Sequence, residues 1–424
     1  MKTLKVILWG KEIGVLSENP DNPNYFLFKY NEDFVKQGIE ICPIAMPLSN
    51  EVYVFDGLSL DSFKGLPPLL SDSLPDRYGN KLLSVWSKKY NKASLNPIEV
   101  LSYIGKRAMG ALEYIPSTDD TNGLENIEID ELVEVANDVL NNRMNIQIDL
   151  KKESNLKKLI DVGSSIGGAR AKAIIAITKD NIIKSGQIAG IKDAKYCILK
   201  FDGLNSDLSE DKEITYYTRI EYSYYLMCTD CGIEMEESFL YEKNSKYHFV
   251  TKRFDRNENG EKIHSLTLGG MAGFDYEKKA EHSYEEIARI LDRIGCSYND
   301  KCQLFSRMVF NVLARNQDDH VKNITFLMDK NGNWRLSPAY DMTYSYNENG
   351  EYTRFHQMRI NNKITDIKRV DLVDSGINMG IKKSKINEII DKIQSVVDNY
   401  QMYGEKANLP DKVIDEIKNN FPTI

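Results

Sequence analysis

The sequence predicts an α+β fold of two lobes, in which a mixed β/α N-terminal domain and a strand-rich lobe precede a mainly helical lobe. Length is the first reason, because 424 residues are too many for one ordinary hydrophobic core. The second is that strand-like and helical patterns alternate as far as residue 260, whereas helical patterns dominate from residue 283 onward. The third is a polar, turn-rich segment at residues 119–123, where we expect the first domain boundary.

We therefore divide the chain into three domains, at residues 1–118, 119–260 and 261–424. The composition, 42% hydrophobic and 28% charged, is that of a soluble globular protein. A net charge of -8 excludes a whole-chain basic surface for nucleic acid, so DNA would be contacted through a partner. The sequence contains no apolar run long enough to span a bilayer. Its first residues are typical of a strand and not of an export signal, so we expect a cytoplasmic protein without membrane contact.

The expected elements follow from the period of the apolar residues and from the turn residues between them. In the first domain we expect strands on either side of the Gly10-Lys11 turn, a strand at residues 25–30, and helices at residues 76–89 and 97–104. In the second we expect strands at residues 173–177, 196–201 and 247–254, and helices at residues 130–142 and 214–231. In the third we expect helices at residues 384–400, with Ser384 as N-cap, and at residues 410–420.

A β-hairpin is also predicted in the third domain. Strand-like residues 324–328 and 334–337 flank Asn331-Gly332, a dipeptide favoured in tight hairpin turns. A hairpin brings its two ends together, so we expect Asn323 and Asp341, which flank it, to lie side by side at its base.

Directly before this hairpin, Asp318 and Asn323 form a D-x-x-x-x-N pattern. This is the spacing of a kinase catalytic loop, in which the aspartate orients and deprotonates the attacking hydroxyl and the asparagine holds a metal ion. The pattern is weak by itself, because both residue types are common in loops. With Asp341 beside Asn323, two oxygen ligands make a site for Mg²⁺ on a nucleotide phosphate, and Asp318 is the candidate base. The neighbouring Asp319 does not give this spacing.

A kinase also needs a lysine for the phosphates and an acid that holds this lysine. Lys200 ends an apolar strand, where burial would be costly without an anionic partner. Glu221, in the following helix, is the candidate partner. The alternative is a strand-end lysine that points into solvent.

Residues 163–172 are rich in glycine and precede a strand. They are not a Walker A motif, because no lysine directly follows Gly168. Backbone N–H groups at Gly167 and Gly168 could still cradle phosphates, the alternative being an ordinary turn. Ser164 and Ser165 stand at the head of the segment, where phosphorylation would add charge that could order or expel the loop.

The histidines and cysteines offer little further chemistry. His320 lies inside the catalytic loop, and we expect it to bridge backbone groups or to contact nucleotide, since Asp318 fills the role of base. The other four histidines have no paired metal-ligand spacing. Cys228 and Cys231 lie in a helical pattern without a second ligand pair, which favours structural packing over zinc or redox chemistry.

Several stretches occur in an order that is typical of one family: Val6–Gly10, Ile13–Leu16, Met46–Ser49, Ser73–Gly79, Ser165–Lys172, Ile198–Lys200, Lys252–Arg256, Asn316–Asn323 and Leu336–Met342. On these stretches the chain resembles the HipA-type serine/threonine kinases, the toxins of bacterial toxin–antitoxin pairs. Residues 263–270 depart from the family's usual sequence, which suggests a divergent branch.

The resemblance implies a two-lobed protein-kinase-like fold and a role for each matching residue. Asp318 matches the catalytic aspartate, and Asn323 and Asp341 match the Mg²⁺ ligands. Lys200 matches the lysine that binds the ATP phosphates, His320 matches a nucleotide-contacting histidine, and Lys252 (through its backbone) and Phe254 match the hinge that holds adenine. Ser165 matches the serine whose autophosphorylation expels the glycine-rich loop and switches the kinase off.

The resemblance also implies partners. Family members are typically neutralised by HipB, a small helix-turn-helix antitoxin, and known targets include aminoacyl-tRNA synthetases. We therefore expect a protein substrate among the translation components, and contact with DNA only through an antitoxin.

Two other interpretations stay open. The first is a small-molecule kinase that uses the same residues. The second is a non-catalytic, nucleotide-binding co-repressor that acts through an antitoxin on DNA. The complete set of Asp318, Asn323 and Asp341 argues against the co-repressor, since a protein without catalysis has no need of all three.

Overall fold

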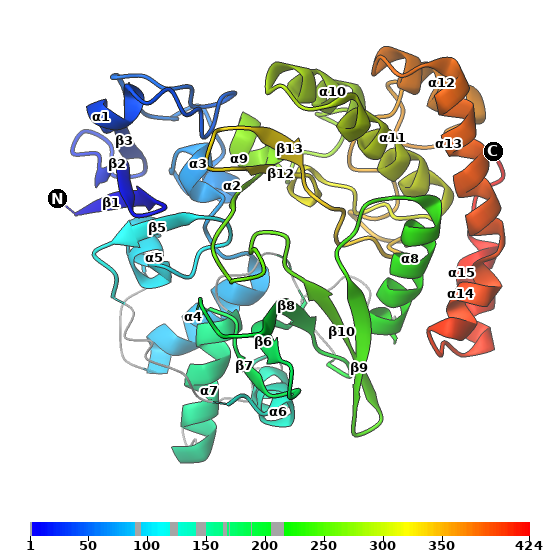
Figure 1. The fold of residues 1–424 in the computed structure, drawn as a ribbon, viewed down its shortest axis with the longest axis horizontal. Helices are drawn as coiled ribbons and strands as arrows, with labels where there is room; N and C mark the ends of the chain where they lie inside the picture. Colours follow the sequence, from blue (N-terminus) through cyan, green and yellow to red (C-terminus); the bar gives the residue numbers. More distant parts are fainter. Residues whose placement is uncertain are drawn as a thin grey trace.

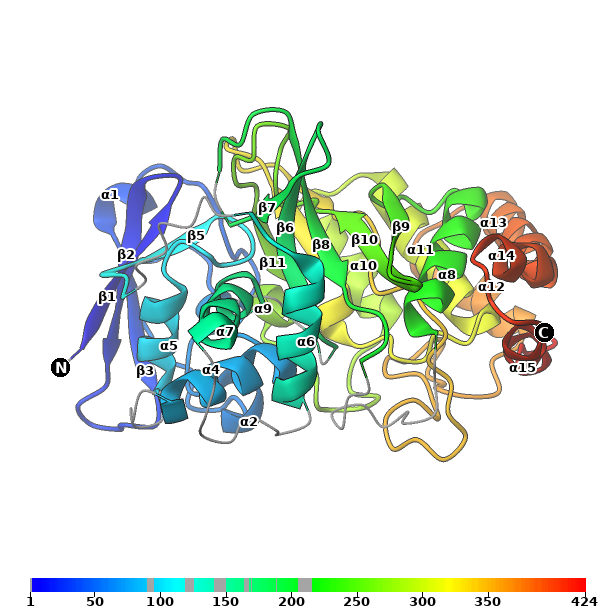
Figure 2. The same ribbon diagram turned by 90° about the horizontal axis from the view of Figure 1, so that it is seen from below.

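The computed structural model describes residues 2–89, 95–118, 126–140, 150–163, 168, 170–187, 189–204 and 216–424. Within these ranges the chain forms three antiparallel sheets and helices along its whole length, with mainly helical structure after the second sheet. Figures 1 and 2 both place the N-terminal strands at one end of the long axis and the last helices at the other, with the second sheet between them.

The first sheet belongs to the N-terminal part. Its strands are β1 (Thr3–Leu8), β2 (Lys11–Glu18), β3 (Phe26–Tyr30), β4 (Val52–Tyr53) and β5 (Leu112–Ile115), in the order β4-β3-β2-β1-β5. Trp9 and Gly10 both have positive φ, the backbone that a two-residue hairpin turn between β1 and β2 requires. The helices here are α1 (Glu32–Val35), α2 (Leu60–Phe63), α3 (Pro68–Ser71), α4 (Arg77–Lys89) and α5 (Pro97–Ile104).

The second sheet carries strands β6 (Lys172–Thr178), β7 (Ile183–Ser185), β8 (Ala194–Lys200), β9 (Ser238–Lys243) and β10 (Lys246–Lys252), in the order β7-β6-β8-β10-β9. Its helices are α6 (Ile129–Leu140), α7 (Leu150–Gly163) and α8 (Tyr217–Cys231). Helix α7 packs on β6, and α8 packs on β9 and β10. Gly232 ends α8 with a left-handed backbone, which is favourable for glycine.

The third sheet is small and belongs to the helical part. It consists of β11 (His264–Thr267), β12 (Thr325–Met328) and β13 (Trp334–Leu336). The helical elements are α9 (Leu268–Ala272), α10 (Tyr284–Arg293), α11 (Tyr298–Leu313), the 3-10 turn η1 (Val321–Asn323), α12 (Arg369–Asn378), α13 (Lys383–Asp398), α14 (Tyr400–Lys406) and α15 (Asp411–Asn419). Serine N-caps with capping boxes begin α10 and α11.

Buried apolar residues form two main clusters. One contains α4, α6 and α7 together with β6 and β8 of the second sheet. The other joins the N-terminal sheet to α8, α10, α11 and the C-terminal helices. The N-terminal part therefore shares a continuous core with the helical part, although the two are far apart in sequence.

The predicted α+β fold of two lobes is confirmed, and the strands and helices fall close to the predicted positions. The helix expected from Ser384 instead begins at Lys383, with Lys382 in the N-cap position. The helix expected from residue 214 begins at Tyr217, and residues 141, 142, 214 and 215 lie outside the described ranges. The domain boundaries remain predictions. None of the helices in the described ranges is both long and apolar enough to cross a membrane.

Candidate active site

The loop between α11 and η1 holds Asp318 in a defined backbone conformation. The hydroxyl of Ser345 accepts the N–H groups of Gln317 and Asp318, at 2.8 and 3.0 Å. The Asn323 side-chain amide closes the loop by donating to the Asp318 carbonyl at 2.8 Å. Because the nitrogen of Asn323 is used in this bond, its amide oxygen is the atom that it can offer to a metal ion.

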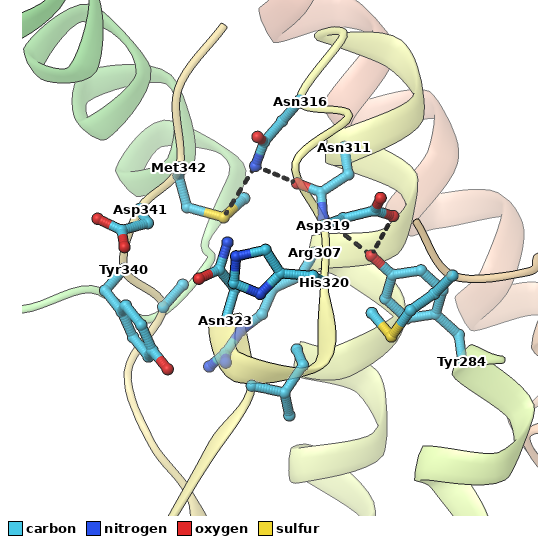
Figure 3. A pocket seen from close by; sticks show the side chains of 13 residues that line it. Tyr284, Arg307, Asn311, Asn316, Asp319, His320, Asn323, Tyr340, Asp341 and Met342 are labelled. Atoms are coloured by element: carbon cyan, nitrogen blue, oxygen red, sulfur yellow. Dashed lines mark hydrogen bonds between the residues drawn. The ribbon is translucent and has the colours of Figure 1, made fainter. Parts of the chain in front are cut away.

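The two adjacent aspartates have different surroundings. Asp319 is 2% exposed and accepts a hydrogen bond from the Tyr284 hydroxyl at 2.9 Å (Figure 3). It also accepts from the Gln357 N–H at 2.8 Å and lies 3.0 Å from His356 Nδ1. These partners fix it as a structural acid. The Asp318 side chain is 49% exposed and therefore accessible to a substrate.

The hairpin predicted from the Asn-Gly turn brings its two ends to one cavity. Strands β12 and β13 pair through Phe326 and Leu336, and Asn323 and Asp341 both line the cavity (Figure 3). Asp341 has a φ of 52°, a left-handed backbone that is strained for a residue with a side chain. Such strain is common where a fold holds a functional carboxylate in place.

Lys200 joins the two lobes of the site. Its ammonium lies 2.6 Å from Glu221 of α8 and also donates to the Asp341 carboxylate. Burial opposes its positive charge, but the two carboxylates outweigh that effect and raise the pKa of Lys200 to about 12. Burial likewise opposes the charge of Asp341, yet Lys200 and Lys172 hold the pKa of that carboxyl well below its usual range.

Lys172 is a second buried lysine, and the sequence analysis did not single it out. It begins β6, is 4% exposed and pairs in register with Lys200 of β8. Burial lowers its pKa to about 8, with Lys200 adding to the effect and Asp341 opposing it. The available signal was its place directly after the glycine-rich segment, at the head of a strand that pairs with the Lys200 strand.

Of the glycine-rich segment, Gly168 is described, whereas Ser165 and Gly167 lie outside the described residues. Gly168 has a φ of 93°, and its N–H donates to the Asp76 carboxylate at 2.8 Å. The other oxygen of Asp76 lies 2.6 Å from the Lys322 ammonium. In the sequence, Asp76 stands at the start of an expected helix and in a family stretch, and Lys322 in another such stretch. Nothing local indicates that their side chains meet, so sequence reasoning missed this contact.

The predicted hinge residues border the site from the β10 side. The Lys252 N–H donates to the Glu237 carbonyl at 2.9 Å, so this amide is already bonded. The Lys252 ammonium lies 2.7 Å from Glu258. The ring of Phe254 lies 5.4 Å from that of Tyr340, which lines the cavity. Phe254 is therefore placed to flank a ligand, and Lys252 can offer its carbonyl group rather than its N–H.

His320 lines the cavity, and its Nε2 lies 4.0 Å from the Asp318 carboxylate. Its Nδ1 is buried and lacks a hydrogen-bond partner within the described part of the chain. Loss of hydration raises the pKa of Asp318, while His320 opposes this rise and the Asp341 carboxylate adds to it. A carboxylate with a raised pKa is a stronger proton acceptor once ionised.

The donor set fits a hard divalent cation. Asp341 supplies a carboxylate and Asn323 an amide oxygen at the same cavity, and Mg²⁺ prefers oxygen ligands of this kind. In the described ranges we find no cluster of three His, Cys, Asp or Glu side chains that could hold a metal ion by themselves. Phosphate oxygens of a nucleotide would complete the coordination, as they do at kinase sites.

Comparisons with known proteins identify the family of the chain. Residues 4–115 match the family model for the HipA N-terminal domain, and residues 164–400 match that for the HipA-like C-terminal domain. A protein named "Putative kinase" from Haemophilus influenzae is 28% identical over 177 residues, 36% of this chain and 51% of that protein. "Putative kinase Y4dM" from Sinorhizobium fredii is 31% identical over 182 residues, 41% of this chain and 42% of that protein. The chain thus matches about half the length of these curated relatives.

Among solved structures, HipA from Shewanella oneidensis, determined in a complex with HipB and its operator DNA, superposes with a TM-score of 0.70 at 17% identity. The match covers 98% of this chain and 95% of that one. The two chains therefore share the two-lobed, kinase-like fold. Because the C-terminal family model alone matches more than half of the sequence, the chain belongs to the HipA family.

Proposed function

We propose that the protein is an ATP- and Mg²⁺-dependent serine/threonine protein kinase. The observation that carries the proposal is the position of Lys200, which contacts both Glu221 of α8 and Asp341 at the base of the catalytic hairpin. A kinase requires this arrangement, because its phosphate-binding lysine must be held by a helix acid and must face the metal-binding aspartate. The names of the curated relatives support the same activity.

In this proposal each part of the site has one task. Lys200 would bind the phosphates of ATP next to the transferred group. Asn323 and Asp341 would hold Mg²⁺, which would supply positive charge near the phosphoryl oxygens. Asp318 accepts a hydrogen bond from the substrate hydroxyl and aligns its oxygen with the γ-phosphorus. The new O–P bond forms as the bond to ADP breaks, and the hydroxyl proton passes to the Asp318 carboxylate.

We further propose that the kinase is the toxin of a toxin–antitoxin pair. The relative from Shewanella oneidensis was solved with HipB and operator DNA, and the net charge of -8 leaves DNA binding to a partner. The antitoxin would be a HipB-like helix-turn-helix protein. The substrate would be a translation component such as an aminoacyl-tRNA synthetase, in line with the family, and Ser165 would be the site of autophosphorylation.

Intact-protein mass spectrometry after incubation with ATP and Mg²⁺ tests the proposal, with the wild type beside Asp318→Asn and with peptide mapping of any modification. We expect one added phosphoryl group on Ser165 in the wild type alone. A wild type that is unmodified at the start and gains nothing would contradict a self-modifying kinase and favour a non-catalytic co-repressor. A starting mass that already includes the phosphoryl group would show that the reaction occurred before purification.

A further inference from the structure

The carboxylate of Asp76 joins two parts of the site that are far apart in sequence. Asp76 directly precedes α4 and is separated from Gly168 by 92 positions and from Lys322 by 246. One of its oxygens accepts the Gly168 N–H at 2.8 Å and the other accepts the Lys322 ammonium at 2.6 Å. A single side chain of the N-terminal part therefore contacts both Gly168 of the glycine-rich segment and the catalytic loop.

The contact with Lys322 acts on the metal-binding side of the cavity. Lys322 immediately precedes Asn323, and its carbonyl accepts the Tyr340 hydroxyl, next to Asp341. Its ammonium is largely buried and lies 4.3 Å from the centre of the Tyr276 ring. Asp76 is the carboxylate that contacts this ammonium. Loss of its charge would therefore release Lys322, which directly precedes the proposed metal ligand Asn323.

The contact with Gly168 acts on the phosphate-binding side. The Gly168 carbonyl accepts a hydrogen bond from the Tyr78 N–H at 3.3 Å. Asp76 and the start of α4 therefore form hydrogen bonds with the peptide groups on both sides of this glycine. A Cβ at Gly168 would lie 2.5 Å from the Lys172 ammonium, which shows how closely that lysine packs against the glycine. Lys172 is in turn the register partner of Lys200. Displacement of Gly168 would therefore disturb both lysines.

We propose that Asp76 is a positioning residue for phosphoryl transfer, which fixes the phosphate-binding lysines relative to the catalytic loop. The inference rests on the proposed kinase function, because it assigns Asp76 a task in that reaction. It also gives the N-terminal part an indirect role in catalysis, through one carboxylate that acts on Gly168 and Lys322.

Asp72, four residues earlier, provides a matched control. It is also a buried acid of the N-terminal part, and its carboxylate accepts the N–H and the hydroxyl of Thr267. No hydrogen bond joins it to Gly168 or Lys322, and its charge acts on the Lys322 ammonium more weakly than that of Asp76. A general loosening of this segment would appear in Asp72→Asn as well, whereas a loss of positioning would appear only in the Asp76 variants.

The experiment compares Asp76→Ala, Asp76→Asn and Asp72→Asn with the wild type. We expect Asp76→Ala to raise the KM for ATP and to lower kcat, each by about tenfold, which is usual for removal of a group that orients a site. Asp76→Asn keeps an acceptor for the Gly168 N–H but loses the charge that holds Lys322, so we expect its kcat to fall more than its KM rises. Asp72→Asn should leave both constants unchanged.

Hydrogen–deuterium exchange of the full chain provides a readout that does not depend on activity. Peptides that contain Gly168 and peptides that contain Lys322 should both exchange faster in Asp76→Ala and not in Asp72→Asn. Unchanged exchange in either peptide, or an equal change in the control, overturns the inference. A wild type that fails to transfer phosphate overturns the proposed function instead, and the exchange result then decides whether the structural link itself exists.

Discussion

At the scale of single residues, adjacent positions with the same side chain carry different tasks. Asp318 is half-exposed at the cavity, whereas Asp319 is buried among Tyr284, His356 and Gln357. The spacing to Asn323 selects Asp318 as the candidate base, and the contacts explain why Asp319 cannot take its place. Loss of the Asp318 carboxylate should therefore affect catalysis, whereas loss of the Asp319 carboxylate should affect stability.

We expect Asp318→Asn to lower kcat by roughly a hundredfold to ten-thousandfold, the usual contribution of a general base. In the wild type the pKa of Asp318 is raised, so the ionised carboxylate is less favourable in the folded state than in the unfolded state. The substitution should therefore leave the free energy of unfolding near neutral pH unchanged or slightly higher. Asp319→Asn should instead lower the free energy of unfolding by about 1–3 kcal/mol, because the amide nitrogen that replaces one carboxylate oxygen cannot accept from a buried donor. A phosphate-transfer assay measures kcat and urea denaturation measures stability. A loss of kcat in Asp319→Asn, together with a loss of stability in Asp318→Asn, would show that the two roles are reversed.

The pH dependence of kcat/KM gives a second test of Asp318. A base must be ionised, so activity should be lost as the pH falls through a pKa that lies above the ordinary value of 3.8. Because His320 opposes the rise in this pKa, His320→Gln should move the acid limb to higher pH. Asp341 stays ionised across this range, since its pKa is well below the usual one. A limb that moves to lower pH in His320→Gln would contradict this arrangement.

At the scale of elements, the site depends on how β8 meets α8 and the catalytic hairpin. Each element has a local cause, such as the capping boxes of α10 and α11 and the Gly332 turn between β12 and β13. The meeting of Lys200 with Glu221 has no local cause. It follows from the packing of α8 on the sheet, which buries both charged side chains.

We expect Glu221→Gln to raise the KM for ATP by about tenfold, because Lys200 would then be held by Asp341 alone and drawn away from the phosphates. Glu237→Gln is the matched control, since Glu237 forms an ion pair with Lys195 in which both side chains are more than half exposed. It should have no effect on KM. Steady-state kinetics with ATP as the varied substrate measures both variants, and an unchanged KM in Glu221→Gln would exclude α8 from nucleotide binding.

At the scale of the whole molecule, the N-terminal part contacts the predicted hinge as well as the predicted catalytic loop. The Asp255 carboxylate accepts the Gly110 N–H at 2.7 Å and forms buried ion pairs with Arg253 and Arg256. Nearby, the Trp9 indole donates to the Lys262 carbonyl at 2.9 Å. These contacts, together with the shared apolar core, link the first sheet to the segment that follows β10.

Asp255→Asn should therefore lower the free energy of unfolding by about 3–5 kcal/mol, because two buried arginines lose their shared anion. Burial opposes the charge of Asp255, but the arginines outweigh it and hold its pKa well below the ordinary value. Its contribution is then present above the unfolded-state pKa and is lost as the pH falls through the folded-state pKa. Denaturation at neutral and acid pH should show the difference from wild type shrinking in acid. Glu258→Gln, an exposed neighbour, should behave as wild type.

The sequence by itself determined the elements and the candidate residues of this protein. Periodic apolar residues, caps and turn dipeptides act over a few positions, so they indicate the elements along the chain. The spacing of Asp318 and Asn323 and the predicted hairpin led to Asp341 in the same way. Only the tertiary structure decided which distant charges meet. Lys172, Asp76 and Lys322 each look ordinary in sequence, because their partners lie in other elements. Their significance arises from burial, which makes an unpaired charge costly and so brings such groups together.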